Sequence, residues 1–361
     1  MNQTARPRRR TKAATLADVA KLAGVSPMTV SRVVNEEPGV RREMRDKVVA
    51  AIAALNYLPH PSAQPTLDTD VVRIGMVFND PSVGYLNDFM IGLLSKAGLP
   101  HVQLDVQRCE LREDEEAMVQ VMIAGGIHGL ILPPPFCDSE PLLRKLAAHG
   151  VLGVVVSSGR PSPLASAIGI DDQRAAYEMT RHLLSLGHQR LGFIVGDKDQ
   201  HCSERRLAGF RQAMNDAGLD PARMAALAYG DFSYRSGLDA AEQLLALESR
   251  PTAIFASNDD MAAATVAIAH RRGLDVPSDL AVVGFDDAPL ATTIWPELTT
   301  IHQPVTAMAG AAVELLVRHI RSRRAGKPLP CEHVLMPFEL LRRQSDAAPR
   351  SRPPLRLGGM A

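Results

Sequence analysis

Residues 15–35, TLADVAKLAGVSPMTVSRVVN, have the pattern of two short helices joined by a tight turn. In the first half, apolar residues recur at the spacing of one helix face, and Thr15 stands before them as an N-cap. Gly24 suits the left-handed backbone that ends a helix, and Ser26 followed by Pro27 is a typical start of the next one. The stretch therefore predicts a helix–turn–helix unit whose second helix buries its valines and presents the side chains between them outward.

A helix–turn–helix unit places its second helix in the major groove of DNA, and the charge distribution of the chain agrees with that use. The first 60 residues contain 11 Lys and Arg against 5 Asp and Glu, a net charge of about +6. The whole chain has 40 residues of each sign, so the remainder carries about −6. A basic head on an acidic body is the footprint of a nucleic-acid-binding protein, and an ordinary helical hairpin is the alternative interpretation.

Composition divides the chain into five parts. A basic arm at residues 1–14 is expected to be disordered, and the DNA-binding domain at residues 15–58 includes a third helix from about residue 41 to residue 55. Residues 59–70, PHPSAQPTLDTD, contain three prolines and are predicted to be a hinge linker. A large domain is assigned to residues 71–345, and a disordered tail to residues 346–361.

In the large domain, short apolar runs alternate with amphipathic helical segments. The runs are VVRIGMVF, HVQLDV, GLILP, LGVVVS, LGFIV, TAIFAS and AVVGF. This alternation predicts an α/β body of two doubly wound parallel-sheet lobes. We place the first lobe at about residues 71–170 plus 300–330, and the second at about 171–299 plus 331–345. Parallel sheets bind ligands at the carboxyl ends of their strands, so a ligand is expected in the cleft between the lobes.

No motif indicates an enzyme, a metal site or a cofactor. The chain lacks a nucleophile elbow, a phosphate-binding glycine loop and a zinc-protease helix, and its four cysteines are widely scattered. No run approaches 18 apolar residues, so no membrane span is expected. A solute-binding receptor would have the same body, but the DNA-binding head and the lack of an apolar export segment favour a cytoplasmic protein.

The sequence resembles the LacI/GalR family of bacterial transcription regulators over about residues 15–345. The most specific segments, besides residues 15–35, are ALNYLP, HLLSLGHQRLGFIVG, ERRLAGF, PTAIFASNDDMA, VVGFDDAPLA and PELTTIHQP. The resemblance implies a homodimer whose paired heads bind a pseudo-palindromic operator on double-stranded DNA. It also implies a repressor whose body is shaped like a periplasmic binding protein. In such a regulator, residues 71–345 form the effector-binding and dimerisation domain, which binds a small effector, a sugar or a sugar derivative, between its lobes.

The resemblance assigns operator recognition to named positions in the head. Pro27, Met28 and Arg32 match base-contacting positions, and the guanidinium of Arg32 suits a bidentate contact to guanine. The positions that match phosphate contacts are Thr29, Ser31, Asn35 and Tyr57. For Thr29 and Ser31, a solvated helix face is the alternative interpretation.

The linker departs from the family pattern, in which a hinge helix inserts a leucine into the minor groove. Thr66 occupies the expected leucine position here, and Pro65 would interrupt such a helix. We predict that Leu67 inserts in a shifted register, with a plain disordered linker as the alternative.

The resemblance also assigns effector contacts to residues that follow strands. Arg206, Asn258 and Asp286 match polar contacts, and such a set suits sugar hydroxyls. Their neighbours Asp259 and Asp287 are expected to be helix caps or turn formers. Phe232 matches a ring that stacks on the effector, with an ordinary core residue as the alternative. The remaining candidates are Tyr85, Ser82 and Ser157, together with Asp172, which either contacts the effector or caps the next helix.

Overall fold

The computed structural model describes residues 16–34, 40–55, 71–79, 82–99, 101–109 and 114–349. The chain consists of two compact units, residues 1–69 and residues 70–361. The predicted basic arm, the whole predicted hinge linker and most of the predicted tail lie outside the described residues. Within the described residues, no helix is long and apolar enough to cross a membrane.

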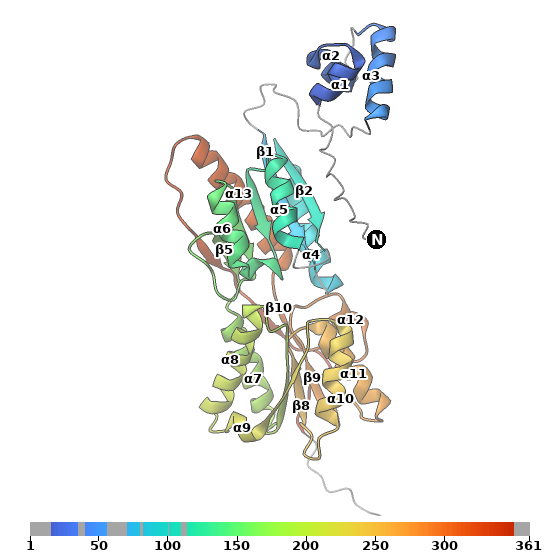
Figure 1. Ribbon diagram of the computed structural model, residues 1–361. Coiled ribbons are helices and arrows are strands. Elements are labelled where there is room, and N and C mark those ends of the chain that lie inside the picture. The colour runs from blue at the N-terminus through green and yellow to red at the C-terminus, as the bar shows by residue number, and fades with distance from the viewer. Residues whose placement is uncertain are drawn as a thin grey trace, which may run out of the picture. The chain divides into compact units, whose positions relative to one another are not determined.

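The first unit contains three helices around a small apolar core. Val19, Val30 and Val48 come from different helices and are fully buried against one another. Gly24 has a φ of +68° directly after the first helix, and the Ser26 hydroxyl accepts a hydrogen bond from the Thr29 amide at 3.2 Å. The predicted helix–turn–helix unit is thus present and is followed by a third helix (Figure 1); the bounds are α1 (Leu16–Ala23), α2 (Pro27–Val34) and α3 (Arg42–Ala54).

The first lobe of the second unit is a six-stranded parallel sheet covered by helices on both faces (Figure 1). Its strand order is β11-β5-β4-β3-β1-β2. The strands are β1 (Val72–Phe78), β2 (Val102–Arg108), β3 (Gly129–Leu132), β4 (Leu152–Val156), β5 (Ser166–Gly169) and β11 (His333–Leu335). One face packs against α4 (Val83–Ala97) and α13 (Val305–Arg324), and the other against α5 (Glu115–Ala124) and α6 (Glu140–Ala148).

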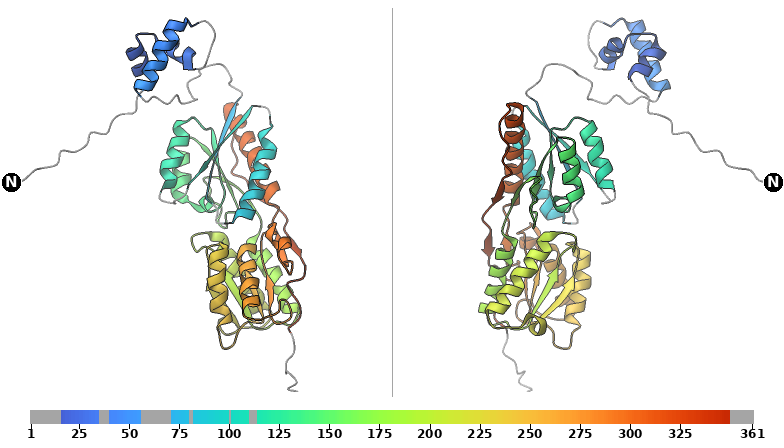
Figure 2. Two further views of the ribbon diagram at one scale, coloured as in Figure 1. Left: turned by 90° about the vertical axis from the view of Figure 1, so that its right-hand side faces the viewer. Right: turned by 60° about the vertical axis from the view of Figure 1, so that its left-hand side comes forward.

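The second lobe is a four-stranded parallel sheet with the order β7-β6-β8-β9. Its strands are β6 (Leu191–Val195), β7 (Ala225–Tyr229), β8 (Ala253–Ala256) and β9 (Ala281–Val283). Helices cover both faces of this sheet, as the views of Figure 2 show. The helices are α7 (Asp172–Ser185), α8 (His201–Asp216), α9 (Pro221–Met224), α10 (Tyr234–Leu245), α11 (Asp259–Arg271) and α12 (Leu290–Thr293). The predicted fold class is confirmed.

The chain passes between the lobes three times, and the last passage lies later in the chain than predicted. An antiparallel pair, β10 (Thr300–His302) with β12 (Glu339–Leu341), accompanies two of these passages. β11 pairs with β5 in the first sheet, so the first lobe extends to at least residue 335 rather than to about residue 330. The boundary was misplaced because β11 has only three residues, which is too short to stand out as an apolar run.

All seven predicted apolar runs form strands, and the strands that were missed share a physical reason. β5 and β7 consist largely of small residues, SAIG and AALAY, which have low intrinsic preference for strands. β10, β11 and β12 have three residues each and depend on pairing partners far away in the chain. Local sequence patterns do not carry that information.

Candidate functional site

A cavity lies between the two lobes at the carboxyl ends of their strands. The space in which the centre of a water molecule fits is about 40 Å³, enough for about three waters. The cavity is therefore small. Its lining combines residues from both lobes and from the crossing segment after β10: Ser82, Tyr85, Pro134, Pro135, Ser157, Gln200, Cys202, Arg206, Phe232, Asn258, Asp286 and Gln303.

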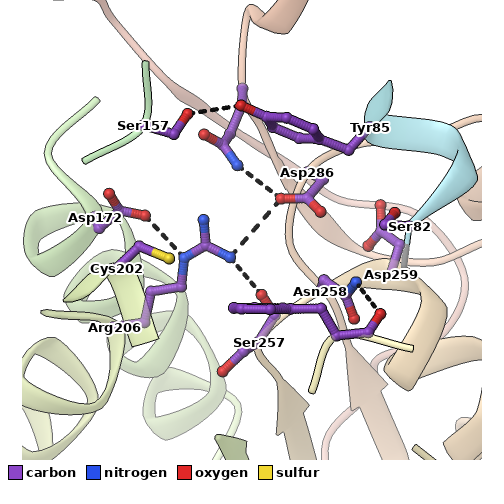
Figure 3. A network of polar contacts seen from close by, with 12 residues as sticks. Ser82, Tyr85, Ser157, Asp172, Cys202, Arg206, Ser257, Asn258, Asp259 and Asp286 are labelled. Carbon is purple, nitrogen blue, oxygen red and sulfur yellow. Dashed lines mark hydrogen bonds and ion pairs between the residues drawn. The ribbon is translucent and has the colours of Figure 1, made fainter. Parts of the chain in front are cut away.

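Arg206 lies at the centre of the polar network in this cavity (Figure 3). Its side chain is 5% exposed, Nε donates a hydrogen bond to Asp172 Oδ1 at 2.8 Å, and Nη1 donates to the Ser257 carbonyl at 2.6 Å. Nη1 also lies 3.8 Å from Asp286 Oδ1. The guanidinium stacks on the Phe285 ring, with its carbon 3.7 Å from the ring centroid. Arg206 is thus held in one orientation, and among the described residues no group accepts a hydrogen bond from Nη2.

Three buried ionisable groups share this site and affect one another. Burial lowers the pKa of Arg206, but the charges of Asp172 and Asp286 outweigh it, so the net shift is upward and Arg206 stays protonated. Burial raises the pKa of Asp172 although Arg206 opposes this effect. Burial likewise raises the pKa of Asp286 to about 7, against the opposing charge of Arg206. Two carboxyl groups therefore face one guanidinium, and Asp286 can change its charge near neutral pH.

Asp286 is held by Gln303, which sequence reasoning missed. Gln303 Nε2 donates to Asp286 Oδ1 at 2.7 Å, and the buried Oε1 of Gln303 has no hydrogen-bond partner within the described residues. Gln303 follows β10, on the crossing segment that carries the chain into the first lobe. Because β10 was not recognised as a strand, the sequence offered no reason to place this glutamine in the cleft.

Asn258 lines the cavity, but its polar atoms already have protein partners. Its Oδ1 accepts a hydrogen bond from the Met261 amide at 3.0 Å, which makes Asn258 the N-cap of α11. Its Nδ2 donates to the Phe232 carbonyl at 2.8 Å. The expectation that Asp259 is a cap is wrong, because its carboxylate instead accepts from the Ala288 amide and the Thr300 hydroxyl. Asp287 has a φ of +58°, as expected of a turn-forming residue.

Asp172 does not cap α7, so that prediction is wrong. It is not among the residues that line the cavity, and effector contact by Asp172 stays a prediction. The N-cap of α7 is Asp171, which accepts a hydrogen bond from the Arg174 amide at 3.0 Å. Asp172 begins the helix and directs its carboxylate to Arg206 Nε, behind the cavity wall. The choice between neighbouring aspartates depends on how α7 packs against α8, which the sequence pattern does not specify.

The first-lobe candidates lie on the opposite wall of the cavity. The hydroxyls of Tyr85 and Ser157 are 2.8 Å apart, and Ser82 Oγ donates to Asp260 Oδ2 of the second lobe at 2.6 Å. Tyr85 and Ser82 are both buried. The structure therefore brings the predicted first-lobe residues together with Arg206, Asn258, Asp286 and Phe232 around one cavity.

Unusual backbone geometry is concentrated at this cavity. Five non-glycine residues of the described chain have a positive φ, and three of them line the cavity: Ser157 at +60°, Phe232 at +69° and Asp286 at +112°. Such conformations cost free energy and persist where the surrounding structure enforces them. The Phe232 ring lies against Gly196, where an added Cβ would be 2.1 Å from the ring. Its place in the cavity lining thus depends on a glycine at the end of β6.

In the first unit, α2 exposes the predicted base-contacting residues. Met28 is 69% exposed, and Pro27 and Arg32 are also exposed. Thr29 is half-buried, with its hydroxyl 2.9 Å from that of Ser26, so Thr29 also takes part in capping α2. Asn35, Tyr57 and Leu67 lie outside the described residues, as does the side chain of Ser31.

The described residues contain no group of three or more His, Cys, Asp or Glu that could hold a metal ion. Cys202 lines the cavity, but burial raises its pKa to about 12, so its thiol stays neutral. The cavity therefore presents hydrogen-bonding groups and one fixed guanidinium. This arrangement suits binding of a small polar molecule.

Comparisons with known proteins agree with this architecture. Residues 15–60 match the family model described as bacterial regulatory proteins, lacI family, and residues 180–345 match that of a periplasmic binding protein-like domain. The chain is 30% identical over 335 residues to catabolite control protein A of Priestia megaterium, a similarity that covers 92% of this chain and 98% of the relative.

Two solved structures resemble the whole molecule. One is the complex of the transcriptional regulator CelR with cellobiose, at 28% identity and a TM-score of 0.69, covering 92% of this chain and 99% of that one. The other is the lac repressor dimer bound to operator and the anti-inducer ONPF, at 28% identity and a TM-score of 0.68, covering 93% and 100%. The chain belongs to the LacI family of bacterial regulatory proteins and is a DNA-binding transcriptional regulator.

Proposed function

We propose that this regulator is a cytoplasmic homodimeric repressor whose DNA binding is controlled by a sugar or sugar derivative bound between the lobes. The two heads of the dimer bind a pseudo-palindromic operator on double-stranded DNA. Their recognition helices then fit half-sites about 34–36 Å apart, or a multiple of one turn. In this proposal residues 15–58 bind DNA, residues 59–70 form the hinge, and residues 71–345 bind effector and dimerise.

The observation that carries the sugar proposal is the composition of the cavity. Arg206 and Asp286 place a fixed donor and an acceptor side by side, and hydroxyls of Tyr85 and Ser157 face them from the other lobe. A sugar presents vicinal hydroxyls that both donate and accept, so it satisfies such a mixed set. Phe232 supplies an apolar ring in the same cavity. The cellobiose bound by the similar regulator CelR supports this ligand class.

Roles within the cavity differ among the predicted residues. Asp286, the free Nη2 of Arg206 and the Tyr85–Ser157 pair are proposed to contact the sugar. Asn258 is proposed to act mainly by shaping the wall, because its polar atoms already cap α11 and hold the Phe232 carbonyl. Entry of a sugar requires the lobes to separate, since the cavity holds only about three waters.

Head residues keep the roles that the sequence predicts. Arg32 is proposed to contact guanine, and Pro27 and Met28 to make apolar contacts with bases. Thr29, Ser31, Asn35 and Tyr57 are proposed to contact phosphates, and Leu67 to insert into the minor groove.

The test uses the full chain and selects its operator from genomic fragments by electrophoretic mobility shift. Calorimetry then measures binding of cellobiose, ribose, glucose and other neutral sugars, and the shift is repeated with each sugar that binds. A sugar effector should change operator affinity roughly 5–150-fold, as expected for a coupling of about 1–3 kcal/mol. Failure of every sugar to bind would refute the sugar proposal, and turnover of a sugar would point to an enzyme instead.

A further inference from the structure

The N-terminus of α8 receives its cap from the opposite lobe. Gln200 occupies the N-cap position of α8 but makes no side-chain capping hydrogen bond. Asp138 of the first lobe, at the end of the short 3-10 helix η2 (Phe136–Asp138), instead accepts from the His201 amide through Oδ2 at 2.9 Å. The first amide of a second-lobe helix is therefore satisfied by a first-lobe carboxylate, although N-caps normally come from the residue that precedes the helix.

Asp138 is fixed in place for this contact. Its side chain is 3% exposed, and Oδ1 accepts a hydrogen bond from Ser158 Oγ at 2.5 Å within the first lobe. Oδ2 also lies 3.3 Å from Nδ1 of the His201 ring. A carboxylate beside the positive end of a sixteen-residue helix gains from the helix dipole as well as from the hydrogen bond.

Gly159, next to Ser158, brings the two lobes into direct backbone contact at the same place. A Cβ added at Gly159 would lie 2.4 Å from the His201 carbonyl carbon, 2.5 Å from the Cys202 nitrogen and 2.6 Å from the His201 oxygen. All three atoms belong to the first turn of α8, in the second lobe. Gly159 has no positive φ, so an alanine there is compatible with its own backbone and meets an obstacle only across the cleft.

We propose, building on the proposed effector cleft, that Asp138 is a positioning residue that holds the lobes closed by capping α8 across the cleft. Arg206 lies on α8 five residues after His201, so the cap also sets the position of the central guanidinium in the cavity. Separation of the lobes removes the cap, and closure around a ligand restores it. The contact therefore links the occupancy of the cavity to the relative position of the lobes without touching the ligand itself.

The test compares variants of the full chain by hydrogen–deuterium exchange of the peptide that covers residues 198–206, with and without cellobiose, ribose or glucose. Asp138→Ala removes a hydrogen bond to a charged group and should speed exchange in this peptide by about tenfold or more. Gly159→Ala should have a similar effect, because its methyl group collides with the first turn of α8 and forces the lobes apart. Asp138→Asn keeps an acceptor and should fall between Asp138→Ala and the natural protein. A sugar that binds the natural protein should bind the two alanine variants about tenfold more weakly.

Two matched controls separate the cap from a general loss of structure. Asp220→Ala removes an N-cap within the second lobe, where Asp220 accepts from the Ala222 amide at 3.0 Å. Gly98→Ala adds a methyl group where nothing lies within 4 Å. Neither control should change exchange in residues 198–206 or sugar affinity.

Each outcome counts for or against the proposal. Unchanged exchange in residues 198–206 of Asp138→Ala and Gly159→Ala overturns the cap, even if sugars bind. Faster exchange over the whole second lobe, or equal effects from the controls, also overturns it, because these results indicate general destabilisation. Failure of every sugar to bind refutes the sugar effector, while the exchange data still decide the cap.

Discussion

The two candidate functional regions of this regulator differ in how far their side chains are exposed to solvent. On α2 the candidate DNA-contacting residues Met28 and Arg32 are exposed, and the buried valines beneath them only hold the helices together. In the cleft the candidate effector-contacting residues Arg206 and Asp286 are buried, and they are held by other ionisable or polar side chains. Substitutions on α2 should therefore change recognition alone, whereas those in the cleft should change recognition and stability together.

Arg206→Ala should give the largest effect. It tests whether a substitution in the cleft changes recognition and stability together. It removes the guanidinium and leaves the buried Asp172 without its ionic partner, which costs about 3–5 kcal/mol of unfolding free energy. Chemical denaturation measures this loss, and calorimetry should show no sugar binding. Arg205→Ala is the control, because Arg205 is exposed and adjacent. Equal unfolding free energies of the two variants would contradict the expectation that the cleft side chains also stabilise the fold.

Asp286→Asn should reveal the pH dependence of the cleft. Because burial raises the pKa of Asp286 to about 7 from 3.8, the folded protein keeps a proton that the unfolded chain has lost. The contribution of Asp286 to the unfolding free energy is thus fully present below about pH 4. It is lost as the pH rises through about 7, by at most roughly 1.4 kcal/mol per pH unit.

The measurement is the unfolding free energy of the natural protein minus that of Asp286→Asn at several pH values. Taking the difference cancels the other buried carboxyl groups with raised pKa, such as Asp172 and Asp259. The difference should fall between about pH 4 and pH 7. A flat difference would show that Asp286 titrates like an exposed carboxylate.

Arg32→Ala tests whether a substitution on α2 changes DNA recognition alone. We expect a loss of about 1–3 kcal/mol in operator affinity, with relaxed preference at one base pair and unchanged thermal stability. Binding to a set of single-base operator variants measures the preference. Equal losses on operator and random DNA would assign Arg32 to a phosphate instead, and a lowered melting temperature would contradict a purely surface role.

Asn258→Ala should give the smallest effect of the four. Loss of the α11 cap should cost about 1 kcal/mol of unfolding free energy, and sugar affinity should fall because the Phe232 carbonyl loses its donor. Ser233→Ala, which removes the cap of α10, provides the control for capping alone. If both variants bind sugar equally well, Asn258 has no role in shaping the cleft.

Much of the architecture was accessible from the sequence because its signals are local. The helix–turn–helix unit depends on Gly24, on the Ser26–Pro27 start and on valines at helical spacing, and each of these acts within one or two turns. The long buried strands likewise show as continuous apolar runs. Short edge strands such as β11 were missed because their pairing partners are far away in the chain.

In the cleft, the sequence identified most of the lining residues through their resemblance to a family but misjudged what several of them do. Asn258 and Asp259 are neighbours, and only the packing of α11 decides that the first is the cap and the second binds Thr300. In the same way, the packing of α7 decides that Asp171 caps this helix and that Asp172 binds Arg206. Gln303 was missed because its position depends on β10.

The sequence by itself determined the kind of head, the two-lobed α/β body and the identity of the central arginine. Only the tertiary structure decided which carboxylates hold that arginine, how small the cavity is, and that Asp138 of one lobe caps a helix of the other. The physical reason is the separation along the chain of the residues that interact. Helix capping, turns and apolar periodicity act between residues close in the chain, whereas the ion pairs and the cap of the cleft join residues far apart in it, such as Asp138 and His201, which are 63 positions apart.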